Sequence, residues 1–241
     1  MIWKILLYAL TGYLALCAMV FIFQRKMLYL PDHSKLSKKS AMDEGLLHWP
    51  LFENFQGFVT QEEPIDSKGT VIVFHGNAGT AYHRSFYARA LSIQNLRVIL
   101  AEYPGYGGRA GQPREDVLVK DAVKTMRHAY KEYGKPLYIW GESLGCGVVA
   151  GAVNKIDIPI KAIVLFLPWD SLSNLAQTHY RFLPARWLVL DKFNNIDNLK
   201  GFKGNIAVIL AGKDEVIPFH HGKKLYDSIT ANKKLWLFKD A

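Results

Sequence analysis

The feature that most constrains the fold is the pentapeptide Gly141–Gly145 (GESLG), which lies between two short apolar segments. Residues 136–140 before it are typical of a buried strand, and the small apolar residues 146–153 after it favour a helix packed on a sheet. A sharp turn between strand and helix lifts the serine of such a motif above the sheet, with glycines where a Cβ would collide with neighbouring backbone. We therefore predict that Ser143 is a nucleophile; an ordinary turn between a strand and a helix is the alternative.

Composition excludes several classes of protein. The chain has 241 residues, half of them hydrophobic and about a fifth charged, which excludes general disorder and predicts one domain with appendages. The formal charge of +9 is spread along the chain and the aromatic residues do not alternate with arginines, so we predict no nucleic-acid partner. The two cysteines, Cys17 and Cys146, are not placed to form a disulfide, and Cys146 is expected to be a small buried filler.

The N-terminal segment predicts a membrane anchor. Residues 5–23 are almost continuously apolar and long enough to cross a lipid bilayer, so residues 1–24 are assigned to a transmembrane helix; a buried core helix is the alternative. Lysines and arginines are more numerous after this segment than before it, which favours a cytoplasmic main domain. Residues 24–44 are polar and rich in lysine, and residues 25–50 are expected to connect the anchor to a domain at 51–241.

Apolar runs alternate with amphipathic segments over this domain. The predicted strands are 52–60 (weakly), 70–74, 97–101, 136–140, 161–167, 205–211 and 234–238, and the predicted helices are 82–95, 113–133, 146–153 and 219–231. This alternation predicts an α/β fold with a mostly parallel, doubly wound sheet, whose site lies at the carboxyl ends of the strands. Residues 171–195 interrupt it and are rich in large apolar side chains. We expect a helical cap over the site at about 169–198; an extra packing helix is the alternative.

At this point the motifs resemble those of the α/β-hydrolase superfamily, in its branch of membrane-anchored serine hydrolases with an H-G-N-A-G turn at 75–79 and a Y-x-G-Y-G turn at 103–107. The resemblance covers the chain from about residue 23. It implies an oxyanion hole formed by the backbone N–H groups of Asn77 and Leu144. It also implies that Asp214, in the loop after the strand 205–211, is the acid of a Ser-His-Asp triad, whereas His75 and the 103–107 turn are structural.

The same resemblance implies a catalytic histidine after the last strand. Here that strand is followed only by Lys239–Ala241, so we expect the histidine and a closing helix to lie outside these 241 residues and the domain to be C-terminally incomplete. A serine without an imidazole base loses most of its rate, on the order of 10⁴-fold or more. Substitution by His220, His221 or His179 is a minor alternative, as is Asp170 in place of Asp214.

Two functional hypotheses follow. The first is a membrane-anchored serine hydrolase that cleaves a small acyl-ester substrate, a carboxylic ester or thioester, and whose 241-residue form lacks its base. The second is a non-catalytic pseudoenzyme or truncated gene product that retains only the scaffold. The remaining histidines have no metal-ligand spacing with cysteine or acidic residues, so we predict no metal and no cofactor.

Overall fold

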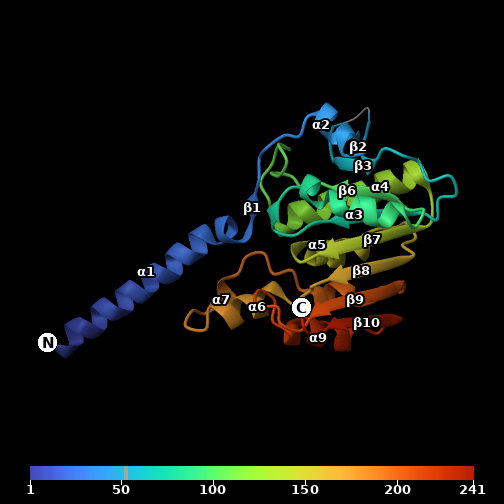
Figure 1. The fold of residues 1–241 in the computed structure, drawn as a ribbon. Helices are drawn as coiled ribbons and strands as arrows, with labels where there is room; N and C mark the ends of the chain where they lie inside the picture. Colours follow the sequence, from blue (N-terminus) through green and yellow to red (C-terminus); the bar gives the residue numbers. More distant parts are fainter. Residues whose placement is uncertain (52–53) are drawn as a thin grey trace.

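An eight-stranded sheet forms the centre of the computed structural model, which describes residues 1–51 and 54–241 (Figure 1). The strand order is β10-β9-β8-β7-β4-β6-β3-β2. The strands are β2 (Leu46–Trp49), β3 (Gly57–Thr60), β4 (Thr70–Phe74), β6 (Arg97–Ala101), β7 (Leu137–Glu142), β8 (Ala162–Phe166), β9 (Asn205–Ala211) and β10 (Lys233–Phe238). From β6 to β10 the neighbours pair in parallel, and only β3 and β2 at one end are antiparallel. The predicted α/β fold is confirmed.

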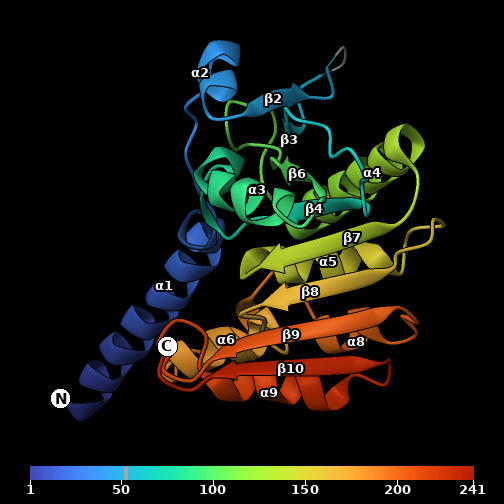
Figure 2. The same cartoon turned by 45° about the vertical axis from the view of Figure 1, so that its right-hand side comes forward.

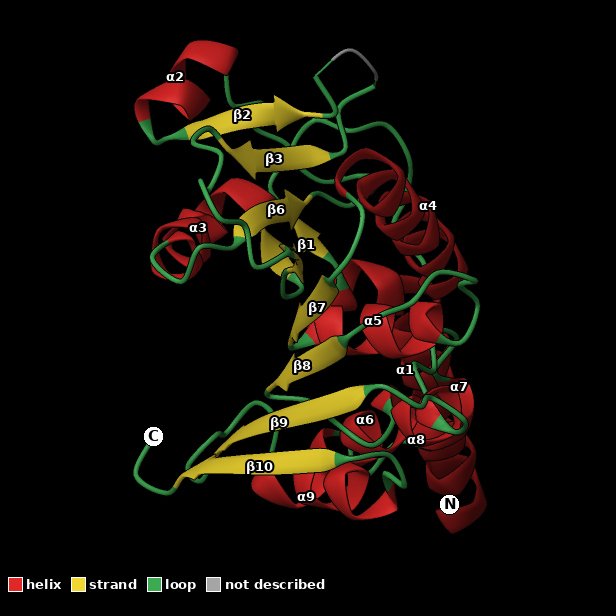
Figure 3. Ribbon diagram, turned by 90° about the vertical axis from the view of Figure 1, so that its right-hand side faces the viewer, coloured by secondary structure: helices red, strands yellow, loops and turns green. Residues whose placement is uncertain are grey.

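The helices cover the two faces of this sheet unequally (Figure 3). On one face lie α4 (Glu115–Tyr133), α5 (Leu144–Val153), α8 (Asn195–Leu199) and α9 (Phe219–Ser228). On the other face lies α3 (Ser85–Ser92), preceded by the short 3₁₀ helix η1 (Ala81–Arg84), next to β6 and β3. None of the described helices covers this second face at β8 to β10, where Trp236 and Phe238 are exposed.

The central strands and α5 make the core because their residues are apolar throughout. All five residues of β4 and all ten residues of α5 are buried. Small residues in α5 let its neighbours approach closely, since a Cβ on Gly151 would lie 2.7 Å from a methyl carbon of Val119 in α4. This close packing fixes the start of α5, and with it the turn at Ser143, against the sheet.

The first part of the domain differs in detail from the expectation. Of the strand predicted at 52–60, residues 52–53 lie outside the described residues, and β3 occupies 57–60. A further strand, β2, forms within the stretch expected to be a connection and pairs antiparallel with β3. The same stretch contains the short helix α2 (Lys38–Asp43) and strand β1 (Leu30–Pro31), which pairs with β5 (Ala78–Gly79). Edge strands of this kind depend on a tertiary partner more than on local pattern.

The N-terminal helix α1 (Ile2–Leu28) projects from the body of the molecule (Figures 1 and 2). It is 27 residues long and apolar enough to cross a membrane, and none of its residues is buried, which excludes the alternative of a buried core helix. The cap region between β8 and β9 contains α6 (Leu172–His179) and α7 (Ala185–Leu188) as well as α8. In Figure 1, α6 and α7 lie on the side of the body from which α1 extends.

Candidate active site

Ser143 lies in the sharp turn between β7 and α5. Its φ of 50° and ψ of −111° are a conformation that residues with a side chain rarely adopt, and its N–H donates to the carbonyl of Phe166 at 2.9 Å. A Cβ on Gly145 would lie 2.0 Å from the carbonyl oxygen of Phe74, and one on Gly141 would lie 2.7 Å from the carbonyl oxygen of Gly145. The turn therefore requires both glycines of the motif, and the surrounding backbone holds the serine in its strained conformation.

The loop 75–79 lies directly beside this turn. A Cβ on Gly76 would be 3.7 Å from the Cβ of Ser143, and Asn77, Ser143 and Leu144 line the same cavity. The carbonyl of Asn77 accepts hydrogen bonds from the N–H of Leu30 at 3.0 Å and from the hydroxyl of Tyr106 at 2.8 Å. These two bonds fix the orientation of the Asn77 backbone next to the serine.

A buried group of polar side chains holds the loop 75–79 in place. Both ring nitrogens of His75 are engaged, Nδ1 with the carbonyl of Gly76 at 2.8 Å and Nε2 with Glu102 at 3.1 Å. The hydroxyl of Tyr103 donates to the carbonyl of His75 at 2.7 Å, and burial raises the pKa of Tyr103 well above its usual value. His75 is only 1% exposed, so it holds the loop and is not available to a substrate.

Asp214 lies in the loop after β9, at the carboxyl edge of the sheet. One of its carboxylate oxygens accepts the N–H groups of Val216 and Ile217, both at 2.8 Å, and its described partners include no imidazole. The N–H of Lys213 donates to the carbonyl of Ala241 at 2.7 Å. The residues that follow β10 therefore lie against the loop that carries Asp214.

Asp170 and His221, two residues weighed as alternative members of a triad, are bonded to each other. His221 Nδ1 lies 2.7 Å from one oxygen of Asp170, and Nε2 lies 3.0 Å from the hydroxyl of Thr178 in α6. Lys224 and Asn174 donate to the other oxygen of Asp170. Burial opposes the charged form of Asp170, but these hydrogen bonds outweigh it and hold the pKa of the carboxyl well below its usual value. The pair ties α9 to the cap, and neither residue lines the cavity at Ser143.

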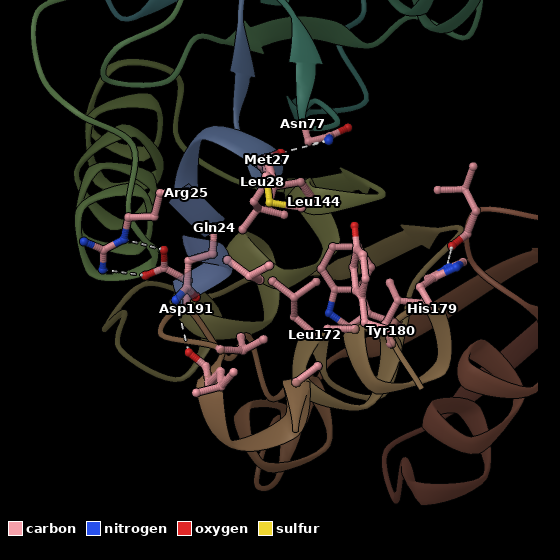
Figure 4. A pocket seen from close by; sticks show the side chains of 18 of the residues that line it. Gln24, Arg25, Met27, Leu28, Asn77, Leu144, Leu172, His179, Tyr180 and Asp191 are labelled. Carbon is pink, nitrogen blue, oxygen red and sulfur yellow. Dashed lines mark hydrogen bonds and ion pairs between the residues drawn. The ribbon is translucent and has the colours of Figure 1, made fainter. Parts of the chain in front are cut away.

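His179 is the histidine that shares a cavity with Ser143. Its Nε2 lies 2.9 Å from the carbonyl of Val216, in the loop that follows Asp214, and Figure 4 shows this contact at the edge of the cavity. A ring nitrogen beside a carbonyl oxygen carries the proton, so Nε2 is the donor and Nδ1 is left as the acceptor. His179 therefore belongs to the site, although the sequence ranked it below His220 and His221.

The cavity above Ser143 has a volume of about 230 Å³ and walls that are mostly apolar. Side chains of the region expected to form a cap supply much of the lining. A second part of the wall, which the sequence did not reveal, comes from the last two turns of α1 (Figure 4). The lining residues of the cap include Leu172, Leu175, Leu183 and Leu188, and those of α1 are Val20, Gln24, Arg25, Met27 and Leu28.

Polar contacts hold α1 against the cap. The Arg25 guanidinium forms two hydrogen bonds with the carboxylate of Asp191, at 2.8 and 3.1 Å. The side-chain amide of Gln24 donates to the carbonyl of Leu188 at 3.1 Å and accepts from the N–H of Leu190 at 2.8 Å. These partners are more than 160 positions apart in the sequence, and the sequence analysis did not predict them. The signal that could have indicated them is the pair of polar residues, Gln24 and Arg25, at the end of an apolar run.

Two further expectations concern cysteine and metal ions. Cys146 is buried directly behind Ser143, where burial raises the pKa of its thiol, so it is a filler of the core and not a nucleophile. Both cysteines are free. Over residues 1–51 and 54–241, no group of three or more histidine, cysteine or acidic side chains could hold a metal ion.

Comparison with known families decides the class of this fold. A sequence profile of the family described as Serine aminopeptidase, S33 (Hydrolase_4) matches residues 65–198, more than half of the chain. The chain belongs to this family of α/β hydrolases. The predicted superfamily is thereby confirmed, and a serine hydrolase scaffold with an N-terminal apolar helix is established for this chain.

Individual relatives are similar over most of the chain. It is 34% identical over 198 residues to the lysophosphatidylserine lipase ABHD12 of Xenopus tropicalis, covering 74% of this chain and 51% of that protein. The chain therefore spans about half the length of such curated relatives. It is 29% identical over 244 residues to an uncharacterized protein of Mycobacterium tuberculosis, Rv2307c, covering 94% of this chain and 83% of that protein.

Solved structures support the fold alone. The Pyrococcus furiosus esterase Pf2001 has a TM-score of 0.63 at 16% identity, covering 89% of this chain and 88% of that one. The structure of Est1E from Butyrivibrio proteoclasticus with bound ferulic acid has a TM-score of 0.59 at 16% identity, covering 73% of this chain and 83% of that one.

Proposed function

We propose that the chain is the catalytic part of a membrane-anchored serine hydrolase that cleaves carboxylic esters, with Ser143 as nucleophile. The observation that carries the proposal is the strained conformation of Ser143 beside the loop 75–79, at an apolar cavity. Backbone strain at a polar residue that lines a cavity is typical of a functional site, because the surrounding structure must stabilise it. An ordinary turn between strand and helix would need neither the strain nor the cavity.

The chemistry assigned to the site follows from its geometry. Ser143 attacks the acyl carbon, and the negative oxygen that forms is stabilised by the N–H groups of Asn77 and Leu144. Leu144 is the first residue of α5, so its N–H points away from the helix, where the partial positive charge of the helix end also favours an anion. The Asn77 N–H belongs to the Gly76–Asn77 peptide, whose carbonyl is bonded to His75 Nδ1 at 2.8 Å. The bonds from Leu30 and Tyr106 to the Asn77 carbonyl hold the next peptide, so the residue is fixed on both sides before substrate binds.

Asp214 is proposed as the acid that orients the imidazole base. Its partners Val216 and Ile217 occupy one carboxylate oxygen, which leaves the other for a ring N–H. We propose that this imidazole comes from residues that follow Ala241 in a longer form of the protein. Support comes from the bond between Lys213 and Ala241, because a chain that continues from this point begins next to the acid loop.

The substrate proposed is a lipid ester with one long acyl chain, and a thioester is the chemical alternative. The apolar cavity suits an acyl chain, and α1 gives the chain a candidate membrane anchor. Relatives named as lysophosphatidylserine lipases make a lysophospholipid the first compound to test. We further propose that the main domain lies on the cytoplasmic side, because positive residues cluster after α1; a domain that resists protease in sealed inverted vesicles would contradict this.

The decisive experiment compares two forms of the protein with p-nitrophenyl acyl esters and a fluorophosphonate label. One form is residues 1–241, and the other continues after Ala241 with Gly-His and a closing helix. We expect hydrolysis and labelling in the longer form only, and loss of both in its Ser143→Ala variant. If both forms fold and neither reacts, the chain is a non-catalytic scaffold, which was the second hypothesis from its sequence.

Strong labelling of the 241-residue form would contradict the proposed source of the base. The next variant would then be His179→Ala, because His179 lines the same cavity as Ser143 and keeps Nδ1 free to accept a proton.

A further inference from the structure

One face of α1 faces the cap and the cavity. Tyr13, Cys17, Val20, Gln24 and Leu28 recur at intervals of three or four residues, which places them on the same side of a helix. Of these, Val20, Gln24 and Leu28 line the cavity at Ser143. The hydroxyl of Tyr13 donates to the carbonyl of Phe182 in the cap at 3.0 Å. The cap therefore follows α1 for several turns toward its N-terminus.

The length of α1 decides how deep these contacts lie if the helix crosses a bilayer. Crossing a hydrocarbon layer of about 30 Å needs about 20 residues of helix. Within Ile2–Leu28, windows of about 20 residues run from 2–21 to 9–28, and every one of them contains residues 9–21. Tyr13 and Val20 thus lie in the hydrocarbon layer whichever window is used. Because Val20 lines the cavity, the cavity itself reaches the acyl chains of the bilayer.

The tip of the cap exposes large apolar side chains, as a segment in contact with lipid requires. Phe182 is 92% exposed and Trp187 is 83% exposed, and no water-facing role accounts for two such side chains on one short segment. The neighbouring Arg181 and Arg186 are also exposed, and their long side chains reach from an embedded backbone to lipid headgroups. Large exposed apolar side chains beside arginines are typical of segments that contact lipid.

We infer that the cavity opens sideways into the bilayer between α1 and the cap, and that a lipid ester enters by this route with its acyl chain along the Val20 face of α1. The inference rests on the proposed function and adds a role to α1, whose Val20 positions the acyl chain. Gln24 and the Arg25–Asp191 pair hold this wall in place (Figure 4). The polar headgroup stays toward the membrane surface while the ester reaches Ser143.

The first test measures chain-length selectivity in the longer, active form of the protein reconstituted in nanodiscs. The substrates are p-nitrophenyl acetate and a lysophospholipid with a long acyl chain, and the variant is Val20→Trp. We expect the ratio of kcat/KM for the long substrate to that for acetate to fall at least about tenfold, because the indole fills the path of the chain while acetate does not use it. The matched control is Ile22→Trp, since Ile22 is 70% exposed on the opposite face. An unchanged ratio in Val20→Trp would overturn the inference.

The second test is independent of catalysis and separates failure of this inference from failure of the proposed function. A Phe182→Cys variant in a Cys17→Ala background carries a bimane label, and Cys146 stays unlabelled because it is buried. Lipids brominated in their acyl chains are expected to quench this label, and aqueous iodide is not. The control label at Lys155→Cys, exposed at the opposite edge of the sheet, should show the reverse. Iodide quenching at position 182 would place the cap in water and refute the route.

Discussion

Asp170→Asn separates a structural from a catalytic role for the buried Asp170–His221 pair. The Asp170 carboxylate is 1% exposed and accepts three side-chain hydrogen bonds, from His221 at 2.7 Å, Lys224 at 2.7 Å and Asn174 at 2.6 Å. An asparagine keeps one acceptor for His221 and turns an amide N–H₂ toward the other two donors. Both ring nitrogens of His221 are used within this network, so we expect the substitution to lower stability and to leave the chemistry at Ser143 in place.

The size of the stability loss follows from the bonds that are broken. Hydrogen bonds to a charged group contribute about 1.5–3 kcal/mol each, and Lys224 regains part of its share because it is 59% exposed to water. We therefore expect a loss of about 3 kcal/mol. For a chain of this size each kcal/mol corresponds to about 2–4 °C, so Tm should fall by about 6–12 °C. The measurement is thermal unfolding of the detergent-solubilised protein, with Lys224→Met as the control that removes only one of the bonds.

The pH dependence of this loss has a definite sign. The pKa of Asp170 in the folded protein lies below its usual value, so its contribution is fully present above about pH 4 and is lost as the pH falls further. The Asn variant has no such group. The difference in Tm between the two proteins should therefore be large at pH 7 and shrink as the pH is lowered below about 4.

The same variant tests our assignment of Asp214 as the acid, because a large loss of activity in folded Asp170→Asn would refute it. Replacing a catalytic Asp that is paired with the base by Asn lowers kcat about 10⁴-fold. In the longer form at 20 °C, well below its Tm, we expect Asp170→Asn to change kcat/KM less than about threefold, which is under 1 kcal/mol. A loss of 10³-fold or more in a folded protein would make Asp170–His221 the catalytic pair and Asp214 a loop residue.

Two further variants test how the site is supported. Tyr106→Phe removes the hydrogen bond to the Asn77 carbonyl, so the residue that supplies the proposed oxyanion donor is held less firmly. We expect kcat to fall about tenfold, which corresponds to about 1.4 kcal/mol, with little change in KM. A change confined to KM would contradict this reasoning. Arg25→Met leaves the carboxylate of Asp191, only 6% exposed, without its cationic partner. A double-mutant cycle with Asp191→Asn should therefore give a coupling of about 1–2 kcal/mol in thermal unfolding, and a value near zero would show that the pair does not hold α1 to the cap.

Local patterns were enough to predict the turn at Ser143 and the strands around it. The apolar run of β7, the glycines on either side of Ser143 and the small residues of α5 all lie within 20 positions of one another, and each has one favoured conformation. The position of the loop 75–79 follows from the buried strand β4 before it, whereas its role was an implication of the family resemblance. In these segments the local pattern and the tertiary contacts favour the same structure.

The parts that escaped prediction depend on partners far away in the sequence. His221 and Asp170 were both named as candidates, but their bond to each other, and the bond from His221 to Thr178, could not be inferred because three separate elements meet there. Gln24 and Arg25 were assigned to the end of an anchor and the start of a connection, since a sequence does not show which residues lie opposite a helix face. Their true partners lie in the cap.

The segment after α1 joins this helix to the loop 75–79, which carries the proposed oxyanion donor Asn77, as well as to the cap. Strand β1 pairs with β5, the N–H of Leu30 donates to the carbonyl of Asn77, and the amide of Asn77 donates to the carbonyl of Leu28 at 2.9 Å. Any movement of the C-terminal end of α1 therefore acts on the Asn77 backbone through direct hydrogen bonds. A helix that served only as a tether would need a slack connection, whereas this one is bonded to both the wall of the cavity and the loop beside the serine. The helix α1 is thus a structural part of the proposed active site, because the loop beside Ser143 is bonded to the segment at its C-terminal end.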